Sequence, residues 1–388
     1  MTRIRVAIIG GGLAGASLAN ALFWLPHLDI QVFEAAPEFS ERGASIGLSK
    51  NTLETLDQIL RAAERLLIEE AGAVVSKSAR VMMGSGEEAV YRASFLRLLL
   101  APLPDHMLHT NKKLVSQHTS SNGRVEVVFE DGAVDHFDAV IGADGIFSSV
   151  RDFVLQDEAL EHEASPAGFW DCSNLVPFDK ASAALGEEYF REGRQYGWIG
   201  HGAFLLHGVL ENRTMVQCIV SGTESDPARD RKRVVTRESL DKVFESCEGG
   251  PTTNGIIDEH KSTPTYANGR ICIVGDAAHA ATPWQGAGAG QAIEDAVVLG
   301  ALFGCISSSE EIDAVFEAFD GVRRPRCQQV IDSSRETGRI LCGQIGGVHD
   351  VDGFREALAH RWDFLYDFDI ARHKEEALAK LEEMKGRD

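Results

Sequence analysis

Three glycines near the N-terminus constrain the fold more than any other feature of this sequence. Gly10, Gly12 and Gly15 follow an apolar run of strand type and open a helical stretch. In a βαβ unit such glycines allow a tight turn, close approach of a pyrophosphate to backbone N–H groups, and close packing of helix on strand. Glu34 ends the next strand-like run, about 20 residues later, where a carboxylate can bind both hydroxyls of a ribose. The pattern predicts an α/β chain with a dinucleotide site, and it leaves FAD and NAD open.

The composition excludes several classes of function. The chain has 388 residues, enough for two or three domains at roughly 150 residues each. Its net charge of −21 repels phosphate backbones and anionic lipid, so we expect neither nucleic acid nor membrane as a partner. The longest apolar run, about 296–306, is shorter than the roughly 20 residues of a membrane span. A signal-peptide outline at the N-terminus is interrupted by the glycines, which favours a soluble, cytoplasmic protein.

Cysteine and histidine patterns give no support for a metal site. The seven cysteines are widely spaced and form no Cys-x-x-Cys pair, which is typical of reduced thiols in a cytosolic protein. The thirteen histidines include no His-x-x-x-His or His-Glu-x-x-His pair. We therefore expect no metal.

Periodicity predicts further elements along the chain. A helix begins after Ser49, another covers 92–100, and residues 125–137 form a hairpin followed by a buried strand at 139–142. Between 161 and 262 alternating runs at 189–199, 204–210 and 214–220 predict a second, antiparallel layer. The α/β pattern resumes with a strand at 271–274 and a helix at about 291–303. The tail, about 352–388, is predicted to be helical.

Two further segments carry chemistry. Asp144 and Gly145 end a strand, and Asp276 opens the stretch 275–295, which reads GDAAHAATPWQGAGAGQAIED. This stretch contains Pro283 and a glycine-rich loop at 286–290. A helix that begins with small residues presents unpaired N–H groups and partial positive charge, which suit the pyrimidine edge of a reduced, anionic flavin. A side chain at these positions would hold the ring away.

These three motifs, in this order, resemble those of the FAD-dependent aromatic hydroxylases, the class A flavin monooxygenases of the para-hydroxybenzoate hydroxylase family. The stretch 275–295 is most similar to the salicylate hydroxylase branch, and the resemblance runs from residue 4 to about 340. It implies an α/β fold with a Rossmann-like FAD-binding domain of GR2 type, an inserted antiparallel β-sheet substrate domain and C-terminal helices. The expected FAD-binding domain comprises 1–72, 91–160 and 263–340, the substrate domain 73–90 and 161–262, and the C-terminal helical segment 341–388.

The resemblance also implies an activity. The enzyme would bind FAD without a covalent bond, take electrons from NADH or NADPH, and use O₂ to hydroxylate a phenolic ring through a flavin C4a-hydroperoxide, with or without decarboxylation. It implies a small aromatic substrate and leaves the oligomeric state as monomer or homodimer. No nucleophile or metal is required by such chemistry.

The family's cofactor residues carry over to defined positions of this sequence. Asp276 would bind the ribityl chain, Arg92 would point to the ribityl phosphate region, and Pro283, Gly286 and Gly288 would form the environment of the flavin ring. His279 is expected to be a packing residue, and Trp284 stands where related sequences often have histidine. The full expected set is Gly10, Gly12, Leu13, Ala14, Gly15, Glu34, Ala35, Gly47, Arg92, Asp144, Gly145, Asp276, Pro283, Gly286, Ala287, Gly288 and Ala289.

The substrate side rests on weaker patterns. Polar and aromatic residues that alternate in the second layer are the candidates for its wall: Arg191, Arg194, Tyr196, Trp198 and His207. Alternation places Arg194, Tyr196 and Trp198 on one face of a regular strand. Arg194 there would bind a salicylate-like carboxylate, and an exposed strand arginine is the commoner alternative.

Four alternatives stay open at this point. A hydroxylase or epoxidase of a larger aromatic or polyketide natural product would use the same motifs. An NAD(P)-dependent dehydrogenase would leave Asp276 and the loop 286–290 without a role. A flavin-dependent halogenase shares the FAD segments, but Tyr196 to Gly200 lacks the Trp-x-Trp-x-Ile-Pro pattern. A non-catalytic binding protein would have no need of Asp144, Asp276 and the loop.

Overall fold

The computed structural model describes residues 3–40, 45–60, 74–76, 87–191, 195–200, 202–210, 213–224, 232–235, 252–344 and 351–386. Its first layer is a six-stranded sheet, parallel except for β17 at one edge. The strand order is β17 (Ala267–Asn268), β18 (Ile271–Ile273), β10 (Ala139–Gly142), β1 (Ile4–Ile9), β2 (Leu28–Phe33) and β6 (Leu108–His109). The central strands β1 and β10 are almost wholly buried, as expected of apolar strands covered on both faces.

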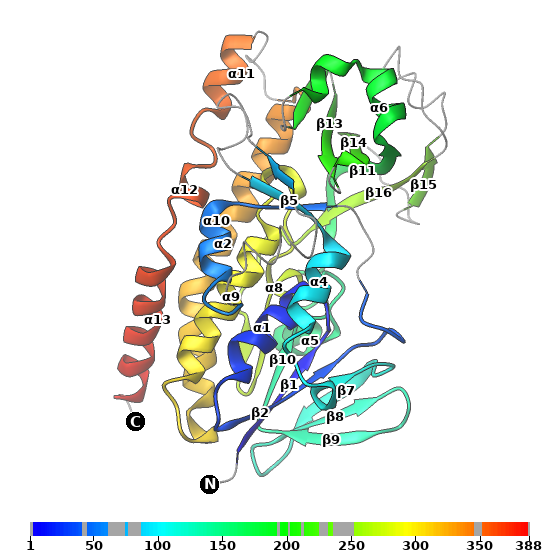
Figure 1. Ribbon diagram of the computed structural model, residues 1–388. Coiled ribbons are helices and arrows are strands. Elements are labelled where there is room, and N and C mark those ends of the chain that lie inside the picture. The colour runs from blue at the N-terminus through cyan, green and yellow to red at the C-terminus, as the bar shows by residue number, and fades with distance from the viewer. Residues whose placement is uncertain are drawn as a thin grey trace.

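Helices cover one face of this sheet. Figure 1 shows the long helices α9, α10 and α13 side by side, with α1 between α9 and the strands. Their bounds are α1 Leu13–Phe23, α9 Gly288–Phe303, α10 Ile312–Leu341 and α13 Ile370–Lys385. Shorter helices are α2 Lys50–Leu56, α4 Arg92–Leu100, α5 Ser149–Leu155, α8 Asp276–His279, α11 Val351–Leu358 and α12 Asp363–Tyr366, with single turns η1 Asp105–Met107, η2 Gln156–Glu158, η5 Pro283–Gln285 and η6 Ser309–Glu311. The Ser49 hydroxyl caps α2, as predicted.

A three-stranded antiparallel sheet packs against the parallel sheet. It contains β7 (Leu114–Thr119), β8 (Val125–Phe129) and β9 (Val134–Phe137), so the predicted hairpin is present. Phe33 of β2 contacts Phe129 and Phe137, with ring centroids 4.7 and 5.7 Å apart. These aromatic contacts hold the small sheet in place.

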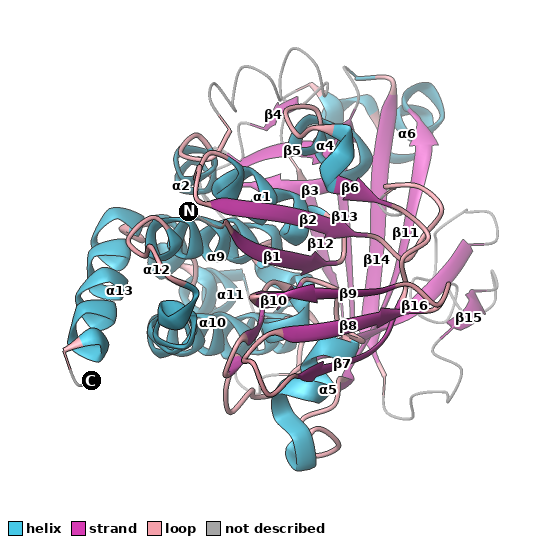
Figure 2. Cartoon of the chain, turned by 90° about the horizontal axis from the view of Figure 1, so that it is seen from below, coloured by secondary structure: helices cyan, strands magenta, loops and turns pink. Residues whose placement is uncertain are grey.

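The second large sheet is antiparallel and its strands run across those of the first, as Figure 2 shows. Its order is β12 (Tyr196–Gly200), β13 (Ala203–Leu210), β14 (Met215–Thr223), β11 (Ser165–Pro177), β16 (Thr252–Glu259) and β15 (Lys232–Val235). The predicted fold class, an α/β part with a separate antiparallel layer, is confirmed.

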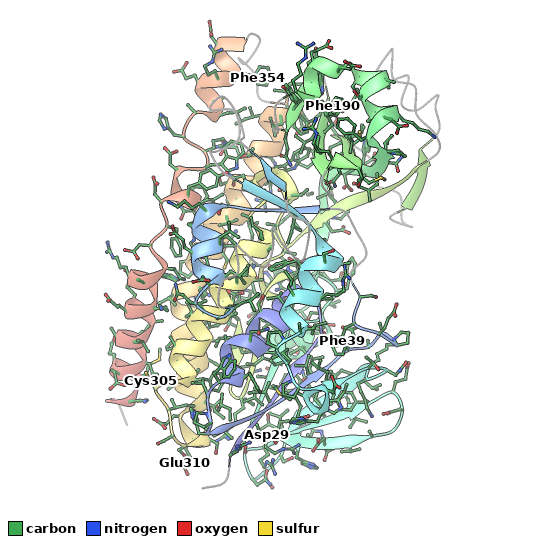
Figure 3. All side chains as sticks on the ribbon, in the orientation of Figure 1. Asp29, Phe39, Phe190, Cys305, Glu310 and Phe354 are labelled. Carbon is green, nitrogen blue, oxygen red and sulfur yellow. The ribbon has the colours of Figure 1, made fainter. Side chains whose placement is uncertain are left out.

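The start of the predicted strand 189–199 is wrong. Glu187–Phe190 form the 3₁₀ turn η3, and strand β12 begins only at Tyr196. Together with α6 (Phe178–Leu185), this turn packs its aromatic side chains onto one face of the sheet. Phe190 lies there, in the upper part of Figure 3. Tyr189 and Phe190, whose residue types are common in strands, thus lie outside the sheet and pack against its face.

A fourth sheet is small and has three strands. Strands β4 (Val74–Ser76) and β5 (Glu87–Tyr91) pair with β3 (Ser45–Leu48) and not with the six-stranded antiparallel sheet. The domain boundaries themselves stay a prediction. Within the described ranges, no helix combines the length and apolar character that a membrane span requires.

Candidate functional site

A cavity of about 420 Å³ opens between the carboxyl ends of the parallel strands and the antiparallel sheet. Carboxyl ends of parallel strands are where open α/β sheets bind ligands. One wall comes from the start of α1, from α4, from α8 and from the segment that leads into α9. The expected site residues on it are Gly12, Leu13, Ala14, Gly47, Arg92, Gly145, Asp276, Pro283, Gly286, Ala287, Gly288 and Ala289.

The glycine turn before α1 is fixed by backbone contact. Gly10 has a φ of +106°, and a Cβ there would lie 2.6 Å from the Ala143 carbonyl carbon. A Cβ on Gly15 would collide with the Gly10 carbonyl oxygen. Helix α1 starts with no side-chain cap and no acidic residue in its first turn. Gly12 and Ala14 at this helix start line the cavity, whereas Gly10 and Gly15 do not.

Glu34 lies beside this turn. Its carboxylate accepts hydrogen bonds from the backbone N–H groups of Gly11, at 2.9 Å, and Ala36, at 2.8 Å. Ala35 lies between these contacts, and neither Glu34 nor Ala35 lines the cavity. The carboxylate therefore joins the end of β2 to the glycine turn, within reach of the first α1 residues.

Asp144 has a structural task of its own. Its carboxylate accepts hydrogen bonds from the backbone N–H groups of Ser149, at 2.8 Å, and Val150, at 3.3 Å, and from the hydroxyls of Ser148 and Ser149. This is an N-terminal cap on α5. The N-cap residue itself is Ser148, and Gly145, next to Asp144, lines the cavity with a φ of +80°.

Arg151 ties α5 to the start of α8. The guanidinium is buried and donates to the carbonyl oxygens of Ala277, at 3.0 Å, and Ala278, at 3.2 Å. Burial lowers the pKa of Arg151 to about 10. Through these bonds α5 holds α8, the helix that carries Asp276. The Asp276 side chain is exposed on the cavity wall.

The glycine-rich loop is shorter than expected. Helix α9 begins at Gly288, three residues before the predicted start at 291, so half of the loop is the first turn of the helix. This turn has no side-chain cap and no acidic residue. A Cβ on Gly286 or Gly288 would meet nothing within 4 Å, because both positions face open space. The helix start presents its N–H groups and positive dipole end to the cavity.

Behind the loop lies a buried ion cluster that the sequence did not reveal. Arg323 is fully buried and donates to Asp295, at 2.8 Å, and to Glu294, at 2.6 Å. His279 lies 2.6 Å from Asp295, which also accepts the Gly275 N–H. Burial alone would raise the pKa of Asp295, but the charges of His279 and Arg323 outweigh it and lower that pKa to about 2.

The same cluster defines the state of His279. Burial by itself lowers its pKa, but the sulfur of Cys327 and the carboxylate of Asp295 outweigh burial and hold the pKa well above its usual value. Potential ligand atoms of His279, Asp295 and Cys327 lie within 4.8 Å of one another. Arg323 donates hydrogen bonds to Asp295 and Cys327, so the guanidinium supplies the positive charge that a metal ion would bring to these ligand atoms. His279 is thus a buried ion-pair partner, in line with the expected packing role.

The opposite wall of the cavity corrects the prediction for Tyr196. Tyr196 stacks on His207, with ring centroids 5.4 Å apart, and both lie on the sheet face that η3 and α6 cover. Trp198 is on this face too, within hydrogen-bond distance of His207. Burial lowers the pKa of His207 to about 4. Tyr196 therefore lies on the far side of the sheet from the cavity.

The arginine candidates take no part in the described wall. Arg191 is exposed at the end of η3, and Arg194 lies outside the described residues. The sheet residues that do line the cavity were missed by sequence reasoning: Gln195, Leu206, Gly208, Gln217 and Ile219. Gln195 precedes β12, and the other four occupy alternate positions of β13 and β14. In the sequence, the glycine at 208 and the amide at 217, each within a mostly apolar strand, were the signals that could have identified the cavity face.

The residues of the first wall fit an FAD molecule. Two uncapped helix starts and small residues suit a pyrophosphate and the edge of a flavin ring. The exposed Asp276 carboxylate can accept hydrogen bonds from a ribityl chain. A Cβ at Gly286 or Gly288 would project into space that is open in this cavity wall.

Comparison with known proteins agrees with this geometry. The family model described as FAD binding domain matches residues 3–334. The 6-methylsalicylate 1-monooxygenase of Aspergillus terreus is 33% identical over 97% of this chain and 92% of its own length. A salicylate hydroxylase of Pseudomonas putida is 30% identical over 97% of this chain and 95% of its own length.

Solved structures share the fold. A salicylate hydroxylase substrate complex superposes with a TM-score of 0.83 at 24% identity, over 97% of this chain and 98% of the other. Klebsiella pneumoniae HpxO complexed with FAD and uric acid superposes with a TM-score of 0.72 at 21% identity, over 97% of each chain.

Proposed function

The chain belongs to the FAD binding domain family and is an FAD-dependent monooxygenase, and from this premise we propose that it hydroxylates a phenolic ring of the salicylate type. The electron donor is NADH or NADPH and the oxygen donor is O₂. The observation that carries the proposal is the cavity itself, in which a glycine-lined wall faces a second wall of amide and aliphatic side chains.

We assign the first wall to FAD. The uncapped start of α1 would bind the pyrophosphate, and Glu34 would exchange its backbone partners for the ribose hydroxyls. Asp276 would bind the ribityl chain and Arg92 the adjoining phosphate region. Bound FAD accepts a hydride from NAD(P)H and activates O₂ for insertion into an electron-rich ring.

The chain's own residues bind, orient and exclude water. Pro283 and the start of α9 would support the flavin ring, and the α9 dipole would stabilise negative charge at its pyrimidine edge. The antiparallel sheet covers the cavity from the other side and keeps solvent from the reacting atoms.

The second wall would hold the aromatic substrate. Leu206 and Ile219 line the cavity and would pack against the faces of the ring, and the amides of Gln195 and Gln217 would hydrogen-bond its hydroxyl or carboxyl oxygens. Gln217 is buried and its amide donates to the Ser173 hydroxyl at 3.1 Å, which fixes its orientation. The side chain of Gln195 lies over Gly208, where an added Cβ would come within 3.0 Å of Gln195 Cγ.

Two substrate types are compatible with this wall. Relatives named for salicylate and for 6-methylsalicylate favour a small carboxylated phenol. A larger natural-product aromatic is the second candidate, because the same cofactor motifs would serve it. The free thiols and the use of NAD(P)H favour action in the cytoplasm.

Substrate-stimulated NAD(P)H consumption tests the proposal. The FAD-loaded protein is mixed with NADH or NADPH, with and without salicylate, 6-methylsalicylate and a set of larger phenols, and products are identified by mass spectrometry. Stimulated consumption with a product one oxygen heavier, or with a diphenol and CO₂, is expected. A protein that binds FAD and oxidises NAD(P)H equally with every phenol and with none would contradict it.

A further inference from the structure

Trp284 lies in the middle of the segment that lines the proposed flavin site, yet it points away from the cavity. Its neighbours Pro283 and Gln285 are on the cavity wall, whereas the indole ring is 6% exposed and lies behind that wall. It contacts Phe169 of β11, with ring centroids 5.1 Å apart, and Phe204 of β13, at 6.0 Å. The indole is therefore packed against the substrate sheet.

Helix α10 closes the other side of the indole. A Cβ on Gly338 would lie 2.6 Å from the Trp284 Cε2 atom and would also collide with Nε1. Glycine inside a helix is less favourable than alanine, and here the close approach of the indole to the helix backbone accounts for it. Trp284 and Gly338 are thus complementary in shape.

A second anchor on α10 holds the start of the same segment. The Thr282 hydroxyl donates to Ser334 Oγ at 3.0 Å, and the Ser334 hydroxyl donates to the Thr282 carbonyl oxygen at 2.6 Å. Ser334 lies one helical turn before Gly338, on the same face of α10. The segment is therefore attached to α10 both by hydrogen bonds and by the indole.

The indole is retained in spite of its polar group. The Trp284 Nε1 atom is buried and has no hydrogen-bond partner among the described residues. A buried donor without a partner is unfavourable, so a phenylalanine would remove that penalty. The size and shape of the ring, and not its N–H group, account for its position.

The strand register links this packing to the substrate wall. Phe204, Leu206 and Gly208 occupy alternate positions of β13 and so face the same side of the sheet. Phe204 contacts the indole, while Leu206 and Gly208 line the cavity. One strand face therefore contacts both Trp284 and the space for substrate.

We propose that Trp284 is a positioning residue: its indole, wedged between the substrate sheet and Gly338 of α10, sets the distance between the Pro283–Gly288 segment and the substrate wall. The inference rests on the proposed FAD site for this segment and does not depend on the identity of the substrate. Reaction requires near-contact geometry, and a displacement of about 1 Å can reduce a rate by about 100-fold.

A pair of complementary variants tests the wedge. Trp284→Phe leaves a gap next to Gly338, so we expect the segment to loosen, with FAD retained and the fraction of NAD(P)H oxidation that yields product reduced by about 10-fold. Gly338→Ala pushes the indole outward, and we expect an FAD dissociation constant raised by about 10-fold or more. In the double variant the alanine methyl fills the gap, and both properties return to within about threefold of the unmodified protein.

Gly321→Ala is the matched control on the same helix. A Cβ there meets only the end of the Lys380 side chain, which is flexible and can move. We expect its FAD affinity, flavin absorption spectrum and product yield to be unchanged. Thermal unfolding of all four variants separates lost stability from lost positioning. If Trp284 had a merely structural role, the double variant would not be expected to recover the fraction of NAD(P)H oxidation that yields product.

Two results would overturn the wedge. One is a Trp284→Phe variant with unchanged flavin spectrum and product yield. The other is a double variant that is no better than the worse single one. If Gly338→Ala does not fold, the product yield and FAD dissociation constant of Trp284→Phe, compared with those of the double variant, still test the wedge. If no phenol is a substrate, the proposed function fails, but the FAD dissociation constants and flavin spectra of the variants still test the wedge.

Discussion

The two walls of the cavity are built in different ways. The wall assigned to FAD is made of backbone: a glycine turn, two helix starts without caps, and small residues. The wall assigned to substrate is made of side chains on alternate positions of β13 and β14, together with Gln195. Backbone walls tolerate few substitutions, whereas a side-chain wall can be changed one residue at a time. This difference suits a shared cofactor and a variable substrate.

The largest expected effect is on the backbone wall. Gly15→Ala places a methyl group against the Gly10 carbonyl oxygen, so the turn has to shift. We expect a loss of about 1–3 kcal/mol of unfolding free energy, as for other overpacked sites, and FAD binding weakened by about 100-fold. Chemical denaturation and an FAD titration measure the two effects.

Gly132→Ala is the control for that variant. This glycine has a φ of +82° in the β8–β9 hairpin with nothing within 4 Å of a Cβ. It should cost about 1–2 kcal/mol from backbone strain and leave FAD affinity unchanged. If Gly15→Ala bound FAD as tightly as the unmodified protein, the backbone shape of this wall would not determine its FAD affinity.

The next effect concerns Asp276, the one acidic side chain on the cofactor wall among the described residues. Asp276→Asn keeps the shape of the side chain but removes the negative charge of the carboxylate, which we propose accepts hydrogen bonds from the ribityl chain. A bond to a charged group contributes about 1.5–3 kcal/mol, so the FAD dissociation constant should rise by about 10-fold or more. Asp313→Asn, at an exposed carboxylate 3.8 Å from Arg270, is the control and should leave FAD affinity unchanged. Full flavin occupancy and unchanged turnover in Asp276→Asn would remove Asp276 from the site.

The two faces of the antiparallel sheet give a direct contrast. Gln217→Leu removes an amide from the cavity wall, and we expect the KM for the phenolic substrate to rise by about 10-fold with FAD content unchanged. Tyr196→Phe, on the covered face, should leave KM unchanged because the ring still stacks on His207. The reverse result, an effect of Tyr196→Phe alone, would exchange the roles of the two faces.

The smallest effects are on pH dependence, and they differ between the two walls. His207, behind the substrate wall, has a pKa lowered by burial to about 4, below its unfolded value of about 6.5. The unfolded state therefore binds more protons in this range, and unfolding free energy falls as pH decreases from about 6.5 to about 4. His207→Gln should reduce this slope in denaturation curves. An unchanged slope would show that His207 is not buried as a neutral ring.

His279, behind the cofactor wall, predicts the opposite. Its raised pKa means that its stabilising contribution is complete below about 6.5 and is lost as pH rises through the higher folded value. His279→Gln should flatten the alkaline side of the stability curve and leave the acid side unchanged. A variant with the alkaline slope of the unmodified protein would contradict the ion pair with Asp295.

Local features were predictable from the sequence and non-local ones were not. The glycine turn, the Ser49 cap and the 125–137 hairpin follow from chemistry within a few residues, and all are present. Which face of β12 meets the cavity is not a local property, because η3 packs its aromatic side chains on the face that carries Tyr196 and Trp198. The Arg323 cluster joins α8, α9 and α10, so no single segment shows it. The site assignments on both walls stay predictions.

Incorporation of labelled oxygen tests the central claim most directly. The FAD-loaded protein turns over the most stimulating phenol with NAD(P)H under isotopically labelled O₂, and the product is weighed by mass spectrometry. The account predicts one labelled oxygen atom in the ring hydroxyl, formed in proportion to NAD(P)H consumed. A product without label, or NAD(P)H consumption that yields only hydrogen peroxide with every phenol, would contradict an aromatic hydroxylase.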